Sequence, residues 1–228
     1  MLSSFFLKKI QVSFHNTYTD IWEYKKAFIE GSIHFSRVIG PKCPICGKTD
    51  EYIQIKEYYR YAIDLFPFKK ELVPIARFLC NTTHRTFSLL PHQLIPYCQY
   101  TLISITRTLF LVNKYQQAGY RGFYHAVNEL SPDSDVTPWL INRWWIVFLK
   151  GFERAHHILS ARFALWDIRS RGGGKKEINR VWEYLKIVAK DSSSPLAEDV
   201  LSVAIWYYSQ TKSHLFGTSS LQRSIKNK

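Results

Sequence analysis

The sequence predicts a mainly α-helical protein with a small β module near its N-terminus and a pair of helices near its C-terminus. Between Pro41 and Pro96 the chain consists of short β-favouring runs that are broken by prolines. After Tyr97, apolar residues recur at intervals of three and four, which is the period of an amphipathic helix. These two sequence patterns predict the fold class.

The composition favours a folded protein with a polyanionic partner. The chain has 228 residues, of which 46% are apolar and 16% aromatic, enough for a packed core. The formal net charge is +13. Lys and Arg that neutralise phosphates release condensed counterions, so this charge favours nucleic acid, although an anionic membrane surface would attract it too.

The charge order at the N-terminus argues against a secretory signal, and the composition of the longest uncharged stretch argues against a membrane span. In MLSSFFLKKIQVSFHN the lysines follow the apolar patch, which reverses the charge order of a secretory signal. The longest stretch without charged residues, Thr86 to Thr106, contains Pro91, Pro96 and several polar side chains, whereas a span needs roughly 20 mostly apolar residues. We therefore expect a cytoplasmic protein with no membrane partner.

Residues 1–40 are expected to form an N-terminal helical segment. Ile21, Tyr24 and Phe28 share one face of a helix predicted for Tyr18 to Glu30, and Gly40-Pro41 ends the segment. Residues 41–96 form the β module, with the runs YIQI and YYRYAI. Its apolar content predicts only a small regular core.

Residues 97–170 are expected to be a helical domain. Apolar spacing predicts one helix from about Leu102 that Gly119 closes, and a second over residues 121–130. The SPDSD stretch is a turn, since Asp and Ser bond to nearby backbone amides. Thr137 is a good N-cap and Pro138 suits the first helical position, so a long helix begins there and runs to about Arg169.

The last part of the chain is expected to hold a helical hairpin over residues 175–211 and a basic tail over residues 212–228. The RGGGKK stretch before it is a flexible break. One apolar stripe from Ile178 to Val188 marks the first helix of the hairpin. Ser194-Pro195 opens the second, which continues to about Ser209.

Four residues in the β module have the spacing of metal ligands. Cys43 and Cys46 form a C-x₂-C knuckle followed by Gly47, and Cys80 and His84 form a C-x₃-H pair. Zinc prefers four nitrogen or sulfur ligands in a tetrahedron, so we expect one structural Zn²⁺ here. Four protein ligands leave no position for a reactive water, which argues against a catalytic metal.

The fourth of these ligands is the least determined by the sequence. Cys98 or His92 replaces His84 if the loop around Pro91 folds back. Metal binding would supply folding free energy of the order of 10 kcal/mol to a module with few apolar residues.

The stretch RFLCNTTHRTFSLLPHQLIPY, from Arg77 to Tyr97, together with the upstream CPICG, resembles the zinc-ribbon segment of bacterial insertion-sequence transposases and their stand-alone relatives. The matching positions are Cys43, Cys46, Arg77, Cys80, Arg85, Thr86, Phe87, Ser88 and Pro91. The family's fourth cysteine falls at Thr83, and His84 beside it is the natural replacement.

This resemblance implies a DNA-binding role in the setting of a mobile element. In that family the ribbon precedes helix-turn-helix segments, and the two bind element ends or serve as the DNA-binding partner of a separate transposase or integrase-type subunit. A bacterial, nucleoid-associated location follows if the resemblance holds. Arg85, within the matched stretch, is then the ribbon's candidate DNA contact.

The predicted helix after Pro138 offers a second candidate DNA contact. Its core stripe is Ile141, Trp144, Trp145 and Phe148. The opposite face and its flank carry residues able to reach bases and phosphates: Trp139, Asn142, Arg143 and Lys150. A short helix, a turn and a longer helix form a helix-turn-helix-like arrangement, although SPDSDVTP exceeds the three or four residues typical of that turn.

The sequence shows none of the common catalytic motifs. It lacks a Gly-rich phosphate loop, a G-x-S-x-G elbow and an H-E-x-x-H helix. We therefore expect a protein that binds double-stranded DNA and is not an enzyme. The alternative is a basic RNA-binding or protein-interaction adaptor stabilised by zinc, in which Tyr58, Tyr59 and Tyr61 stack on single-stranded bases.

Overall fold

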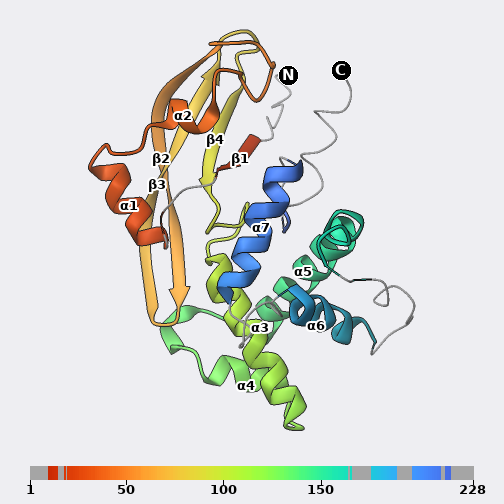
Figure 1. Cartoon of the computed structure of the whole chain (residues 1–228). Coiled ribbons are helices and arrows are strands. Elements are labelled where there is room, and N and C mark those ends of the chain that lie inside the picture. The colour runs from red at the N-terminus through yellow and green to blue at the C-terminus, as the bar shows by residue number, and fades with distance from the viewer. Residues whose placement is uncertain are drawn as a thin grey trace, which may run out of the picture. The chain divides into compact units, whose positions relative to one another are not determined.

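The computed structural model describes residues 10–14, 18, 20–163, 165, 176–188, 197–211 and 214–216. Helices and a small β-sheet together make up the fold (Figure 1). The chain divides into two compact units. Of the described residues, the first unit contains 10–14, 18, 20–60 and 73–91, and the second contains the rest.

A four-stranded sheet in the order β1-β4-β3-β2 forms the β part of the protein. Its strands are β1 (Ile10–Phe14), β2 (Tyr52–Leu65), β3 (Phe68–Cys80) and β4 (Thr86–Pro91). β4 pairs with β1 in parallel and with β3 in antiparallel orientation. The division between the units falls within β2 and β3, whose joining segment, residues 61–72, belongs to the second unit.

The β strands are longer than the short runs expected from the sequence. YIQI and YYRYAI lie in one continuous strand, β2, and Pro74 lies inside β3 rather than ending it. The described pairs between β3 and β4 run from Arg77 to Leu79, so the missing N–H of Pro74 falls outside them. The carbonyl of Pro74 accepts a hydrogen bond of 3.0 Å from the buried Tyr24 hydroxyl.

Two helices belong to the first unit, together with β1, β4 and parts of β2 and β3. The first, α1 (Ile21–Ile29), begins at Asp20, whose side chain accepts from the backbone N–H groups of Trp22 and Glu23. The second, α2 (Phe35–Ile39), ends at Gly40, whose φ of 77° requires glycine's freedom.

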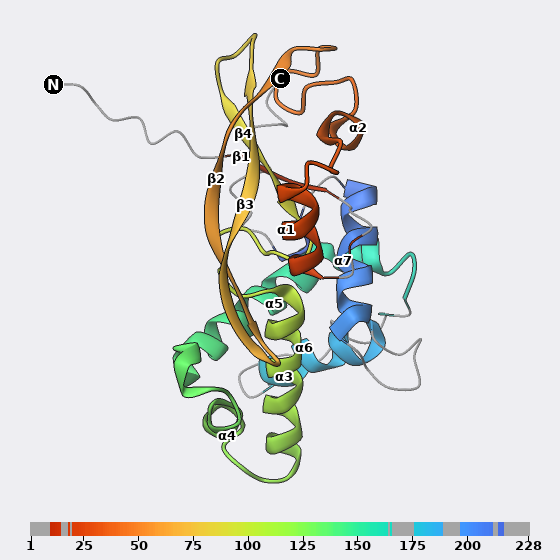
Figure 2. The same ribbon diagram turned by 90° about the vertical axis from the view of Figure 1, so that its left-hand side faces the viewer.

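The helix α1 lies beside the strands of the first unit (Figure 2), and an aromatic core joins both helices to these strands. Consecutive ring contacts connect α1, α2 and the sheet, and the rings of Phe78 and Phe87 are stacked with centroids 5.3 Å apart. The members are Tyr24, Phe28, Phe35, Tyr52, Phe78 and Phe87. The small core expected for residues 41–96 is therefore enlarged by rings that the preceding segment supplies.

The predicted helices of the second unit are present. They are α3 (Leu102–Gln117), α4 (Gly122–Asn128), α5 (Pro138–Leu159), α6 (Lys176–Val188) and α7 (Ala197–Thr211), with a short 3-10 turn, η1 (Pro132–Ser134), before α5. The Thr137 hydroxyl accepts from the backbone N–H of Leu140, as expected of an N-cap. α5 ends at Leu159, ten residues before the expected Arg169.

The two C-terminal helices pack on earlier helices as well as on each other. α6 contacts α5 and α7 contacts α3. Arg180 of α6 forms an ion pair of 2.5 Å with Glu153 of α5, and the ring of Tyr184 stacks on Phe152. The expected hairpin is therefore part of the core of the second unit.

A short C-terminal segment, His214 to Phe216, is held against α5. The Phe216 ring stacks on Phe148 with centroids 4.0 Å apart. The Arg154 guanidinium donates to the carbonyl oxygens of His214 and Leu215, at 3.3 and 2.7 Å. Gly151 allows this approach, because a Cβ there would lie 2.7 Å from the Leu215 carbonyl oxygen.

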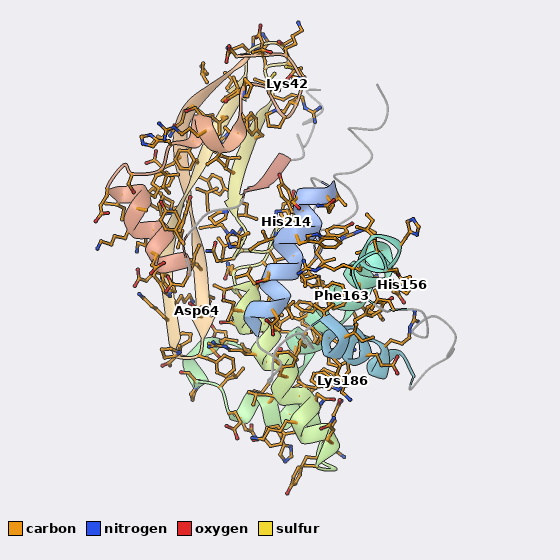
Figure 3. All side chains as sticks on the ribbon, in the orientation of Figure 1. Lys42, Asp64, His156, Phe163, Lys186 and His214 are labelled. Carbon is orange, nitrogen blue, oxygen red and sulfur yellow. The ribbon has the colours of Figure 1, made fainter. Side chains whose placement is uncertain are left out.

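The start of α3 is fixed by a small polar network around Asp64, labelled in Figure 3. The Asp64 carboxylate accepts hydrogen bonds from the hydroxyls of Thr101 and Ser104, and Ser104 Oγ accepts from the backbone N–H of Leu65. The network lies within the second unit.

Among the described helices, none has the length and apolarity that a membrane crossing requires.

Candidate metal centre

The first pair of cysteines lies in a tight turn between α2 and β2. The backbone N–H of Cys43 donates to the carbonyl of Lys48, and the N–H of Gly47 donates to the carbonyl of Cys43, both at 2.8 Å. Lys42 and Thr49 form an antiparallel bridge at the base of the turn. Lys42 is labelled at this end of the sheet in Figure 3. Gly47 has a φ of 75°, so the chain reverses there.

The third cysteine, Cys80, ends β3 and begins the turn into β4. Its backbone N–H donates to the carbonyl of Arg85 at 2.9 Å, and its carbonyl accepts from the N–H of His84 at 2.8 Å. The turns are linked, because the Asn81 N–H and the Thr82 hydroxyl both bond to Glu51, which follows the first turn.

The sulfur atoms of Cys43, Cys46 and Cys80 lie within 4.8 Å of one another. Cys43 and Cys80 are buried and Cys46 is half-buried, and all three are free thiols. A tetrahedral ion with Zn–S bonds of about 2.3 Å places its sulfurs about 3.8 Å apart. The three cysteines can therefore bind one metal ion after a small movement of their side chains.

The two buried thiols, Cys43 and Cys80, have pKa values shifted in opposite directions. Burial raises the pKa of Cys43 to about 11 against the opposing effect of the backbone N–H groups of Cys46 and Ile45. Burial also opposes ionisation of Cys80, but the hydroxyl and backbone N–H of Thr83 and the thiols of Cys43 and Cys46 lower its pKa to about 7. The group can hold one thiolate readily. A cation would favour the others, since thiolates are the form that binds metal.

The candidates for the fourth ligand fall in different places. His84 is exposed and does not belong to the group of three thiols. His92 and Cys98 lie in the second unit, whereas the three thiols lie in the first. Residue spacing did not indicate Thr83, whose Oγ1 is buried beside the Cys80 thiol.

The predicted nucleic-acid contacts on the long helix are all exposed. Trp139, Asn142, Arg143 and Lys150 lie on the solvent side of α5, and Trp139 is 64% exposed. The Arg143 guanidinium lies over the Trp139 ring at 4.9 Å. The residues of the predicted core stripe are buried, namely Ile141, Trp144, Trp145 and Phe148. Spacing alone therefore assigned the two faces of α5 correctly.

The other predicted contacts lie on β2 and beside the metal centre. Arg85 is half-buried and closes the second turn through its carbonyl. Lys48, which motif reasoning did not single out, closes the first turn in the same way, so each turn has one basic residue. On β2, Tyr59 and Tyr61 are exposed and Tyr58 is half-buried.

Comparisons of the chain with protein-family models, with curated proteins and with solved structures find no match. Functional inference from this chain therefore depends on its own residues. The group of three thiols has the most definite chemistry among them.

Proposed function

We propose that this chain is a zinc-dependent DNA-binding protein that acts by binding and has no catalytic centre of its own. The observation that supports it most directly is the group formed by Cys43, Cys46 and Cys80. These residues come from two turns that lie more than 30 residues apart in the sequence. Three converging thiols favour a soft, borderline ion over magnesium or calcium, and zinc is the common choice for tetrahedral sulfur sites.

The ion has a structural task in this proposal. It ties the turn before β2 to the end of β3, so that its binding free energy becomes folding free energy. The basic residues that follow the two turns, Lys48 and Arg85, are then held beside the centre, where each can approach a phosphate.

DNA recognition in this proposal belongs to the exposed face of α5. An Arg stacked on an aromatic ring keeps its guanidinium fork available for two hydrogen bonds, and the Arg143–Trp139 pair has this form. Asn142 beside it can bond to adenine, and Lys150 two turns further on can contact a phosphate. The face therefore offers both base-reading and charge-neutralising groups.

The mobile-element setting is supported by the resemblance of Arg77 to Tyr97 to transposase ribbons and by the order of α4 and α5, a short helix followed by a long one. Residues 129–137 between them exceed the usual helix-turn-helix connection. We propose a helix-turn-helix-like element that binds element ends as an accessory to a separate transposase or integrase-type subunit.

The first test measures zinc and DNA binding on the same preparation. Elemental analysis of the purified chain should give one zinc per molecule. After selection of a preferred duplex, Arg143→Ala should cost about 1–3 kcal/mol on that duplex and little on a scrambled one, because a guanidinium paired with a base reads sequence. Lys150→Ala should weaken both duplexes alike and reduce the salt slope by about one unit.

Arg143→Lys is the matched control. It keeps the charge and loses the planar fork, so it should resemble Arg143→Ala on the selected duplex and the wild type on the scrambled one. Equal losses on both duplexes for Arg143→Ala would show that α5 does not read bases. Well under half an equivalent of zinc would remove the metal from the proposal.

The second candidate is an adaptor that binds RNA or another protein. It is favoured by the exposed apolar residues Ile146 and Val147, which lie on α5 next to the proposed DNA contacts and suit a protein surface better than a phosphate backbone. The same salt series on single-stranded RNA separates the two functions, because the adaptor would bind RNA at least as tightly as duplex DNA.

A further inference from the structure

The two turns that carry the cysteines have the same backbone design. In each, the cysteine N–H donates to the carbonyl five residues later, and the cysteine carbonyl accepts from the N–H four residues later. The flanking pairs also agree, since Lys42 opposes Thr49 in the first turn and Leu79 opposes Thr86 in the second. Residues 42–49 and 79–86 therefore correspond one to one.

This correspondence identifies the residue of the second turn that is equivalent to Cys46. Counting three residues from Cys43 gives Cys46, and counting three from Cys80 gives Thr83. Both residues are half-buried. The side-chain oxygen Oγ1 of Thr83 is buried and lies beside the Cys80 thiol. A hydroxyl that donates its hydrogen to a thiolate still has oxygen lone pairs that can face a cation held by the same thiols.

By the same correspondence, His84 of the second turn is equivalent to Gly47 of the first. Both residues lie in the left-handed region, with φ of 53° and 75°. A Cβ built on Gly47 has no heavy atom within 4 Å, so this position of the turn faces open space rather than the thiols. His84, exposed and outside the thiol group, fits that description.

We propose that Thr83, and not His84, occupies the fourth corner of the metal centre, so that the ion is held by three thiolate sulfurs and the Thr83 hydroxyl oxygen. The inference depends on the zinc site of the proposed function and determines its fourth ligand. A neutral hydroxyl binds zinc more weakly than a thiolate, and it leaves the three-thiolate centre with one negative charge fewer than four thiolates would give.

The test compares variants of the full-length chain at the two positions. Zinc affinity is measured by competition with a chelator, and the number of thiolates by the sulfur-to-metal charge-transfer absorption of the Co²⁺-loaded protein. Thr83→Cys should tighten zinc binding and add a fourth thiolate to the cobalt spectrum. His84→Gly should leave both unchanged, because glycine accepts the left-handed φ without strain.

Two further variants keep the test decisive where Thr83→Cys fails to fold. Thr83→Ser retains the oxygen and should keep the wild-type affinity. Thr83→Val has the same shape without the oxygen and should weaken zinc binding by about tenfold, at the lower end of the effect of groups that support a metal site.

The outcomes separate this inference from the proposed function. Loss of zinc in His84→Gly, with wild-type affinity in Thr83→Val, would identify His84 as the ligand and overturn the inference alone. Absence of zinc from the wild-type chain would overturn both. A cobalt spectrum of Thr83→Cys with the thiolate absorption of the wild type would also overturn the assignment of Thr83.

Discussion

His84 has a backbone conformation that only glycine adopts without cost. Its φ of 53° lies in the left-handed region, where a Cβ approaches the following carbonyl oxygen. The corresponding residue of the first turn is Gly47, with a φ of 75°. The chain therefore has the favourable residue in one turn and a strained one in the other.

His84→Gly should stabilise the protein by about 1 kcal/mol, because it removes that steric cost. Urea unfolding of the zinc-loaded chain measures the change in the free energy of unfolding. Glu30→Gly is the matched control, since Glu30 follows α1 with an ordinary φ of −74° and glycine there should destabilise. Destabilisation by His84→Gly would show that the imidazole makes a favourable interaction.

Single residues also show how far sequence reasoning reaches into the site. The thiols of Cys43, Cys46 and Cys80 could be predicted because their spacing is itself the geometric requirement for a shared ion. Thr83 is the position of the family's fourth cysteine in the resemblance, but threonine is not among the usual zinc ligands, so the sequence did not favour it. The C-x₃-H spacing favoured its neighbour instead.

Apart from the end of α5, helix boundaries followed from the sequence more closely than strand lengths did. The signals at Thr137 and Gly119 are local, and the structure places a helix N-cap at the first and a left-handed residue after α3 at the second. The length of β2 and β3 depends on pairing between strands, which lets Pro74 remain inside β3. Proline counted as a strand breaker because its neighbours in the sheet were unknown.

Thr137→Ala should destabilise the second unit by about 1 kcal/mol, because the N–H of Leu140 loses its acceptor at the start of α5. Thr137→Ser retains the acceptor and should stay within a few tenths of a kcal/mol of the wild type. Thermal unfolding of both variants checks this. Equal effects of alanine and serine would show that the methyl group, rather than the hydroxyl, stabilises the helix start.

The metal centre and the helical core belong to different units of the molecule. The three thiols lie in the first unit, whereas α3 to α7 lie in the second, whose core contains the buried rings of Trp144, Phe148 and Phe152. The first unit has its own aromatic core around Phe78 and Phe87. The ion is therefore expected to affect the stability of the two units unequally.

Removal of zinc with a chelator should increase amide hydrogen exchange in residues 42–52 and 78–88, since these segments lose their shared ion. Exchange in α3 and α5 should remain close to that of the zinc-loaded protein. Cys98→Ser, outside the thiol group, serves as a control that should keep its zinc. A uniform loss of protection over the whole chain would show that the ion stabilises both units.

The contact of His214 to Phe216 with α5 has a consequence for preparing fragments of the protein. The ring of Phe216 covers Phe148, and the Arg154 guanidinium uses the carbonyls of His214 and Leu215 as acceptors. A fragment that stops at the end of α7, at Thr211, would leave an arginine without these acceptors and a large ring uncovered. Expression of the helical unit, or a fusion at its C-terminal side, should therefore retain the chain through Phe216.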